Sequence, residues 1–267
     1  MESKTINNVD WMKLVPDENN DWINQRDKSY ESFTPFIKDK STTNGIFLNQ
    51  FTGVYPARDN WVVGFSRKNV ISNSKIMVEN YNNELVRLKN VSDPKERMKN
   101  VNKAENFIKW SRGLTKKFET NQEITLDEKK VVLFMHRPFT KKWMFYEKNI
   151  IEMPSRYQHI FRNMGNVLYL QGQGSKKEFS CIATNLIPNL QLIHNGKGFP
   201  MYAGRDSLGL VSNISEEFTT TKKISNEEVF YLIYAVLHSK EYKEKFANDL
   251  SKNFPRIPNL KDKQKFI

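Results

Sequence analysis

The first long apolar segment of the chain runs from Gly45 to Arg67. Its hydrophobic residues come in short groups that Gly53 and Pro56 interrupt. This pattern predicts two strands joined by a turn. Because proline cannot donate to a sheet ladder, Pro56 is expected at the turn or at a sheet edge.

A helical period follows between Asn69 and about Thr120. Its apolar residues recur three to five positions apart, at Ile76, Tyr81, Leu85 and Leu88. Asp93 and Pro94 interrupt the pattern. A second, basic helix is therefore expected from Pro94 to Phe118, with Asp93 or Ser92 as its N-cap.

The middle of the chain favours strands. β-Branched and aromatic residues concentrate in the segments "KKVVLFMHRPF", "WMFY", "NVLYLQ", "FSCIAT" and "LQLIHN", the last of which ends at Asn195. Loops are expected at Gly172–Lys177, a hairpin connection with a basic tip, and at Asn185–Asn189. Residues 201–223 show no clear period and are expected to form a long surface excursion.

Two capped helices are predicted near the C-terminus. Ser225 and Glu228 form an S-x-x-E capping box before the apolar segment "VFYLIYAVLH". Ser239 can cap a second helix, which ends before Pro255. The apolar face of this second helix carries Tyr242, Phe246 and Leu250. The segment "FPRIP" then leaves as an extended tail.

Together these patterns predict a mixed α/β (α+β) fold. A central β-rich region from about Gly45 to Asn195 is expected to have flanking helices and a C-terminal helical pair. The predicted organisation is an N-terminal extension with short elements (1–44), a main domain (45–258) and a basic tail (259–267).

Composition adds a strong electrostatic bias. The 267 residues are 38% hydrophobic and 12% aromatic, which is typical of a globular chain, and they carry a formal net charge of +12. A polyanion is therefore the first partner to consider. A Lys- and Asn-rich composition can also be basic without any such partner, so charge alone leaves both interpretations open.

Several classes of protein lack support in this sequence. No segment approaches the roughly 20 apolar residues of a membrane span, and the N-terminus lacks an apolar signal core, so a cytoplasmic protein without membrane contact is expected. Cys181 is the one cysteine, and the four histidines, His136, His159, His194 and His238, have no metal-ligand spacing. Phosphate-binding loops, a hydrolase elbow and the Asn-Pro-Pro-aromatic signature of adenine methyltransferases are missing. No catalytic residue, metal or cofactor is therefore predicted.

Six motifs in order resemble one family. The segments "DWINQR", "GVYPARDNWVVGFSR", "WSRGL", "HRPFTKKWMFY", "GFPMY" and "YAVLHSKEYKEKFANDLSKNFPRIP" are similar to the C-terminal specificity domain of type ISP restriction-modification enzymes, from about Asp21 to Pro258. The chain departs from the usual pattern at Pro56 and Ala57, at Gly198, and at Ala203 and Gly204.

The resemblance implies a target recognition domain that reads double-stranded DNA and is not catalytic by itself. In that family a nuclease, an ATP-driven translocase and an adenine-N6 methyltransferase precede this domain. The methyltransferase and translocase part is thus the expected partner, in cis or in trans. The chain is expected to be a fragment, a split gene product or a stand-alone subunit.

The segment "HRPFTKKWMFY" supplies the candidates for phosphate contact. If it forms a strand, turn and strand, Lys141 and Lys142 lie at the turn, while Phe139, Trp143 and Phe145 point toward the core. Arg137, Lys141, Lys142 and Arg58 are the predicted phosphate ligands. For Arg58 a structural role at a turn is the competing interpretation.

Base readout is expected from loops, because a segment that recurs through the family cannot select different targets. Glutamine and asparagine suit adenine edges, and arginine and lysine suit guanine. The candidates are Gln171, Gln173, Lys176, Lys177, Asn195, Lys197 and Arg205.

Two other functions remain open from the sequence. One is an interaction module that docks a methyltransferase and contacts DNA little. The other is a nuclease or methyltransferase without a recognisable motif. A DNA reader should concentrate its basic residues on one face, whereas a docking module should expose an apolar patch.

Overall fold

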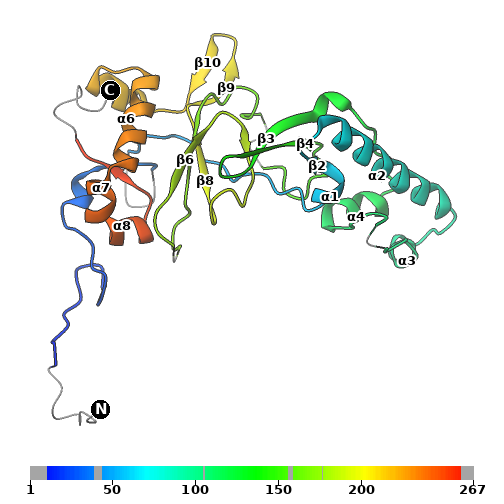
Figure 1. Ribbon diagram of the computed structural model, residues 1–267, viewed down its shortest axis with the longest axis horizontal. Helices are drawn as coiled ribbons and strands as arrows, with labels where there is room; N and C mark the ends of the chain where they lie inside the picture. The colour runs from blue at the N-terminus through cyan, green and yellow to red at the C-terminus, as the bar shows by residue number, and fades with distance from the viewer. Residues whose placement is uncertain (1–10, 39–43, 105, 156–158, 176, 260–267) are drawn as a thin grey trace.

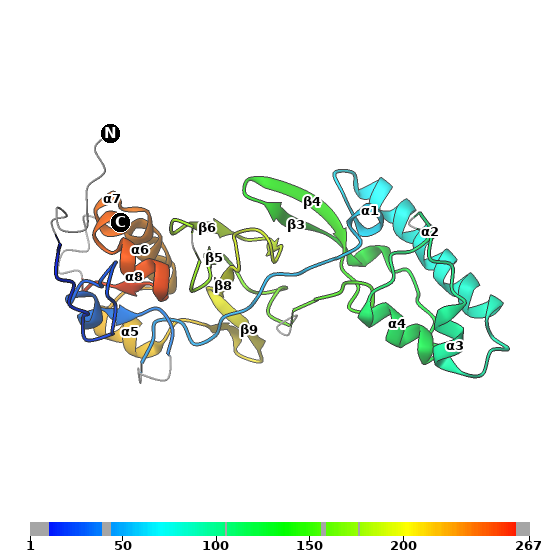
Figure 2. The ribbon, with the colours of Figure 1, turned by 90° about the horizontal axis from the view of Figure 1, so that it is seen from below.

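The computed structural model describes residues 11–38, 44–104, 106–155, 159–175 and 177–259. The molecule is elongated, with one group of helices at each end and the strands between them (Figures 1 and 2). One end holds α1 (Asp59–Val62), α2 (Arg67–Arg87), α3 (Pro94–Lys99) and α4 (Arg112–Glu119). The other holds α5 (Glu216–Lys222), α6 (Asn226–His238), α7 (Lys240–Lys245) and α8 (Ala247–Lys252). The predicted mixed α/β fold is confirmed.

The first helical group follows the predicted pattern only in part. Asp93 caps α3 by accepting from the backbone N–H of Lys95, as predicted. The single helix predicted from Pro94 to Phe118 is wrong, since α3 and α4 are short and separate. Asn102 lies between them, where its Oδ1 accepts from Ala104 N and its N–H donates to Glu84 Oε1. These side-chain bonds replace the helical ones.

A four-stranded sheet adjoins these helices, in the order β2-β4-β3-β7. Its strands are β2 (Val63–Gly64), β4 (Thr140–Phe145), β3 (Val131–Arg137) and β7 (Ile187–Pro188). Of the two strands predicted between Gly45 and Arg67, only one forms, as the short strand β2. That segment makes only isolated bridges before α1, because Pro56 has no N–H to donate and Ala57 has φ +64°. The loop predicted at 185–189 instead contains β7.

A second sheet has the order β6-β5-β8. It consists of β6 (Cys181–Thr184), β5 (Val167–Leu170) and β8 (Lys197–Pro200), and the β5–β6 connection is the predicted hairpin loop. "LQLIHN" is not a strand, because Leu192 turns inward against Met135 and Tyr169. Residues 201–223, predicted to form a long surface excursion without a clear period, contain the hairpin of β9 (Tyr202–Asp206) and β10 (Gly209–Ser212), and then α5.

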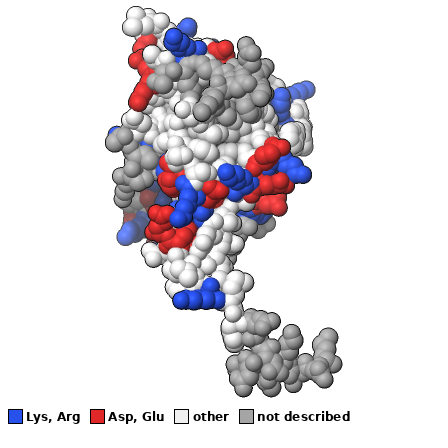
Figure 3. Space-filling view, turned by 90° about the vertical axis from the view of Figure 1, so that its left-hand side faces the viewer, with Lys and Arg blue, Asp and Glu red and all other residues white. Residues whose placement is uncertain are grey.

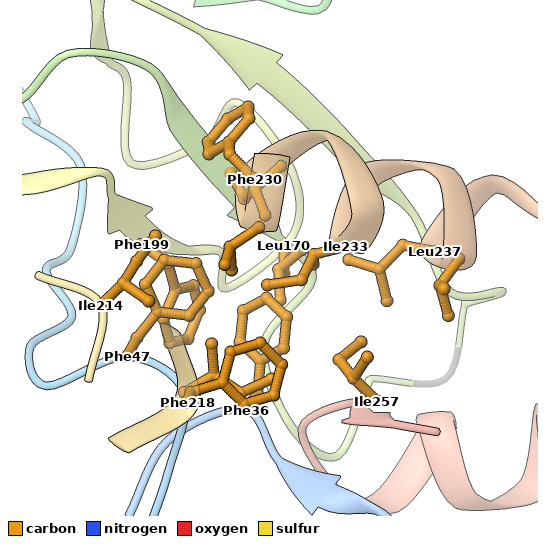
Figure 4. Close-up of a cluster of buried hydrophobic side chains, with 14 of the residues drawn as sticks. Phe36, Phe47, Leu170, Phe199, Ile214, Phe218, Phe230, Ile233, Leu237 and Ile257 are labelled. Atoms are coloured by element: carbon orange, nitrogen blue, oxygen red, sulfur yellow. The ribbon is translucent and has the colours of Figure 1, made fainter. Parts of the chain in front are cut away.

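Aromatic rings fill the core beneath the C-terminal helices (Figure 4). Phe36 and Phe199 meet edge to face at 4.7 Å between ring centroids, and Phe47 lies 4.9 Å from Phe36. Tyr30 and Phe36 come from the predicted N-terminal extension, where Tyr30 is the first and buried residue of the short 3₁₀ turn η2 (Tyr30–Ser32). Part of that extension is therefore integral to this core.

The ends of the chain close the same core. β1 (Thr34–Pro35) pairs with β11 (Arg256–Ile257), so the predicted extended tail forms a strand. Residues 260–267 of the predicted basic tail lie outside the described residues. The capping box of Ser225 and Glu228 is confirmed, as is the Ser239 cap. The second predicted helix is divided at Phe246 into α7 and α8.

Candidate nucleic-acid interface

The β3–β4 hairpin carries the motif that the sequence singled out. Its two-residue turn is Pro138–Phe139, and Phe139 has φ +59°. The Phe139 ring is 90% exposed, so the prediction that it points toward the core is wrong. Proline suits the first position of a turn because its φ is fixed, and the second position here requires a left-handed backbone.

Lys141 and Lys142 lie on β4 rather than in the turn. Successive strand residues point to opposite faces, so the two lysines flank the hairpin on either side. Lys141 is exposed, while the Lys142 Nζ lies 4.8 Å from the ring centroid of the exposed Phe65. Trp143 is half-buried and Phe145 is fully buried, which confirms the core role predicted for these two rings.

Arg137 completes a basic hairpin end. Its guanidinium donates to His136 O at 2.7 Å and to Asn189 Oδ1 at 3.3 Å, and the side chain is exposed. No Asp or Glu occurs between residues 131 and 146. Burial and the charges of Lys142 and Arg137 lower the pKa of His136, while the charge of Asp59 partly opposes the shift, so this histidine is mostly uncharged at neutral pH. The charge of the hairpin end thus comes from its lysines and arginine.

Arg58 occupies a different environment from the other predicted phosphate ligands. It is only 2% exposed, and its guanidinium donates to Lys109 O at 3.0 Å, to Ile150 O and to Ser111 Oγ. Burial lowers the pKa of Arg58 to about 10, and the charge of Glu152 partly opposes that shift. Arg58 therefore joins three segments of the protein interior, in agreement with the structural interpretation.

Three of the predicted readout residues line one hollow. Gln173, Asn195 and Lys197 border a cavity of about 550 Å³ between the β5–β6 loop and the start of β8. We call it the readout hollow; its lining consists of Gln50, Thr52, Gly172, Gln173, Leu190, Asn195, Gly196, Lys197 and Phe254. The two loops are in close contact, since a Cβ on Gly172 would lie 2.1 Å from Asn195 O.

Gln50 distinguishes this hollow from an ordinary surface depression. Its Oε1 is buried and has no hydrogen-bond partner among the residues that the structure describes. A buried acceptor without a partner costs free energy unless a ligand or water satisfies it. The wall of the hollow thus contains a buried amide acceptor without a partner among the described residues, in addition to the exposed amides of Gln173 and Asn195.

Of the remaining readout candidates, the described residues Gln171, Lys177 and Arg205 do not line the hollow. Gln171 is only 5% exposed, and its Nε2 donates to Lys177 O at 2.8 Å, so it braces the hairpin loop from inside. Lys177 is exposed at that loop. Lys176 lies outside the described residues. Arg205 is exposed on the β9–β10 hairpin, which projects from the end of the second sheet opposite to the β5–β6 loop (Figure 1).

A loop connects the hairpin with the readout hollow. Arg137 contacts Asn189, and the chain then continues through Leu190 to Asn195, which both line the hollow. Asn189 also donates its N–H to Met135 O on β3. The loop of residues 189–195 therefore links the β3–β4 hairpin, with its cations, to the hollow, with its amides.

The end of the molecule formed by the C-terminal helices has a different surface. Lysines and arginines alternate there with acidic residues (Figure 3). Several of the cations form ion pairs, such as Lys252 with Asp21 at 2.8 Å and Lys245 with Asp27 at 3.8 Å. Paired charges of this kind attract a polyanion weakly, so this end is a poor candidate for DNA contact.

The described parts of the chain contain neither a cluster of metal ligands nor a helix suited to span a membrane. Within these parts, no group of three or more His, Cys, Asp or Glu side chains is arranged to hold a metal ion. No helix among them is long and apolar enough to cross a bilayer.

Two features of this region escaped the sequence analysis. The exposure of Phe139 follows from the Pro-Phe pair, because proline fixes the first turn position and forces the next residue to the tip. Gln50 and Thr52 lie far from the other hollow residues in sequence, and only the tertiary fold brings them together.

The chain belongs to the family of Type ISP C-terminal specificity domains, whose family model matches residues 45–267. Among solved structures it is similar to a nuclease-deletion mutant of the Type ISP restriction-modification enzyme LlaGI in complex with a DNA substrate mimic. That similarity has 34% identity and a TM-score of 0.81, and it covers 98% of this chain and 24% of that one.

Two further DNA complexes resemble the chain. The DrdV–DNA complex has 26% identity and a TM-score of 0.80, covering 99% of this chain and 27% of that one. The ATP-dependent Type ISP enzyme LlaBIII bound to DNA has 26% identity and a TM-score of 0.77, covering 95% and 17%. This chain thus spans about a quarter or less of their length. No curated protein matched.

Proposed function

We propose that this chain is the sequence-specific DNA target recognition domain of a Type ISP restriction-modification enzyme and is not catalytic by itself. It would act in the cytoplasm on double-stranded DNA, together with a methyltransferase and translocase part in cis or in trans. Family membership and the DNA-bound state of three similar proteins support this proposal.

One observation carries the proposal within this chain. Side chains suited to base edges gather in the readout hollow, beside a hairpin whose cations form no salt bridge among the described residues. Affinity for DNA comes mainly from phosphate contacts, and specificity comes from base edges. The hairpin would supply the first through Arg137, Lys141 and Lys142, and the hollow the second through Gln173, Asn195 and Lys197.

Selection of bound duplexes from a random pool tests the proposal directly. Enrichment of a defined sequence by the unchanged chain is the expected result. Retention of DNA without any enrichment would reduce the proposal to non-sequence-specific binding, and failure to retain DNA at low salt would contradict it.

Replacing Lys141 and Lys142 by alanine should weaken binding roughly tenfold on every duplex, because phosphate contacts carry no sequence information. Fluorescence anisotropy on the selected duplex and on a scrambled one provides the comparison. Lys240→Ala with Lys245→Ala is the matched control, since it removes the same charge from the end whose cations are paired. A change of preference in the β4 variant would mean that its lysines read bases.

Gln173→Ala and Asn195→Ala should instead reduce discrimination between the selected and scrambled duplexes. A good base contact is worth roughly 1–3 kcal/mol, so each loss should lower the ratio of affinities about 5- to 150-fold. Gln191→Ala is a suitable control, because Gln191 is exposed nearby but does not line the hollow. Equal loss of affinity on both duplexes would assign these residues to phosphate contact.

A further inference from the structure

Phe139 combines two unfavourable features. Its ring is 90% exposed, and its φ of +59° lies in the left-handed region that glycine adopts freely and a phenylalanine does not. Neither feature helps the chain to fold, since an exposed ring buries little apolar surface. Strained residues that the surrounding structure holds in place tend to cluster at ligand sites.

The strand pairing of the hairpin fixes the backbone that carries Phe139. β3 and β4 pair from Val131↔Phe145 to Arg137↔Thr140, with an irregularity between Met135 and Arg137 close to the tip. β2 and β7 flank the pair on its two outer sides. Phe139 therefore projects from the end of a supported two-stranded ribbon and not from a free loop.

The positive charges around the tip are placed so that they could face the two phosphate backbones that border a DNA groove. A groove that receives a two-stranded ribbon has a phosphate backbone along each side. Lys141 and Lys142 leave β4 on opposite faces, and Arg137 lies just across the turn on β3. A ribbon entering the groove tip first would bring one lysine toward each backbone and the Phe139 ring toward the bases.

We propose that Phe139 is a wedge whose ring enters a base step of the bound duplex and partly unstacks it. Apolar side chains inserted in this way open and kink DNA at the step that they enter. This inference rests on the proposed function. It adds a residue that stacks against bases and makes no hydrogen bond to a base edge, so it contributes to affinity and to the distortion of the duplex and does not choose the target sequence.

Exposure alone does not single out Phe139, as a second hairpin shows. Leu208 is 95% exposed near the turn between β9 and β10. Beside it lies the carboxylate of Asp206, whose Oδ1 accepts from Leu208 N at 2.8 Å and from Gly209 N at 3.1 Å. Arg205 precedes Asp206, so the two charges offset each other and this tip lacks the surplus of cations found on the β3–β4 hairpin. Leu208→Ala is therefore the matched control for loss of an exposed apolar tip.

The test uses the whole chain and a short duplex selected by it from a random pool. Anisotropy gives affinity, and permanganate oxidation of thymines reports unstacking. Phe139→Ala should bind about 5- to 100-fold more weakly, as for loss of other base–aromatic contacts, and should abolish the thymine reactivity that the unchanged chain induces. Phe139→Trp should keep both properties, and Leu208→Ala should match the unchanged chain.

Phe139→Gly separates this role from a folding defect. Glycine relieves the left-handed strain, so the melting temperature should hold or rise by about 2 °C while DNA affinity falls as in Phe139→Ala. Unaltered affinity and thymine reactivity in Phe139→Ala would overturn the wedge alone. Failure of the unchanged chain to bind any duplex at low salt would overturn the proposed function as well.

Discussion

Raising the salt concentration from about 50 mM to about 200 mM should weaken the binding of this chain to duplex DNA roughly 300- to 1,000-fold. A domain that contacts about five phosphates releases their counterions, so log K should fall against log salt with a slope of roughly −4 to −5. The net charge of +12 and the cations of the β3–β4 hairpin, which form no salt bridge with the residues that the structure describes, motivate this expectation.

Anisotropy titrations of one duplex across a salt series measure the slope. The variant lacking Lys141 and Lys142 should show a slope about two units shallower, because each phosphate contact contributes about one. The variant lacking Lys240 and Lys245 carries the same net charge and should keep the original slope. A flat response in the unchanged chain would contradict phosphate contact, and equal slopes in both variants would remove the hairpin from the interface.

Local signals in the sequence were enough for several elements of the fold. Ser225 and Glu228 cap α6 because the capping box depends on residues only three positions apart. The two strands of the β3–β4 hairpin follow from their apolar segments, but the turn, expected at Lys141 and Lys142, lies at Pro138–Phe139. From Gly45 to the start of α1, by contrast, the chain pairs with distant residues through single bridges. Such pairing leaves no local pattern in the sequence that would predict it.

The candidate site was predictable in its chemistry but not in its arrangement. Residue type alone pointed to Gln171, Gln173 and Arg205, yet only Gln173 lines the readout hollow. Gln171 is turned inward because a backbone carbonyl of its own loop accepts its amide. Arg205 follows Lys197 by eight positions, but β8 and β9 carry it to the opposite end of the sheet (Figure 1). Such differences depend on tertiary packing.

Arg58→Ala should destabilise the folded protein by about 3–5 kcal/mol, as expected when one member of a buried polar network is removed. The substitution would leave Lys109 O and Ile150 O without a donor and would remove the charge that faces Glu152. Urea unfolding followed by circular dichroism measures the effect. Arg137→Ala is the matched control and should change stability by less than about 0.5 kcal/mol, because that arginine is exposed.

The same variant decides between the two interpretations of Arg58. A structural arginine should affect DNA affinity only through the fraction of unfolded chain, so binding at low temperature without urea should stay near that of the unchanged protein. Replacing the pair together, as Arg58→Met with Glu152→Gln, should restore part of the lost stability, since the buried charge of Arg58 and the half-buried charge of Glu152 are then removed together. Strongly reduced DNA affinity in a fully folded Arg58→Ala variant would instead make this guanidinium a phosphate ligand that becomes accessible on binding.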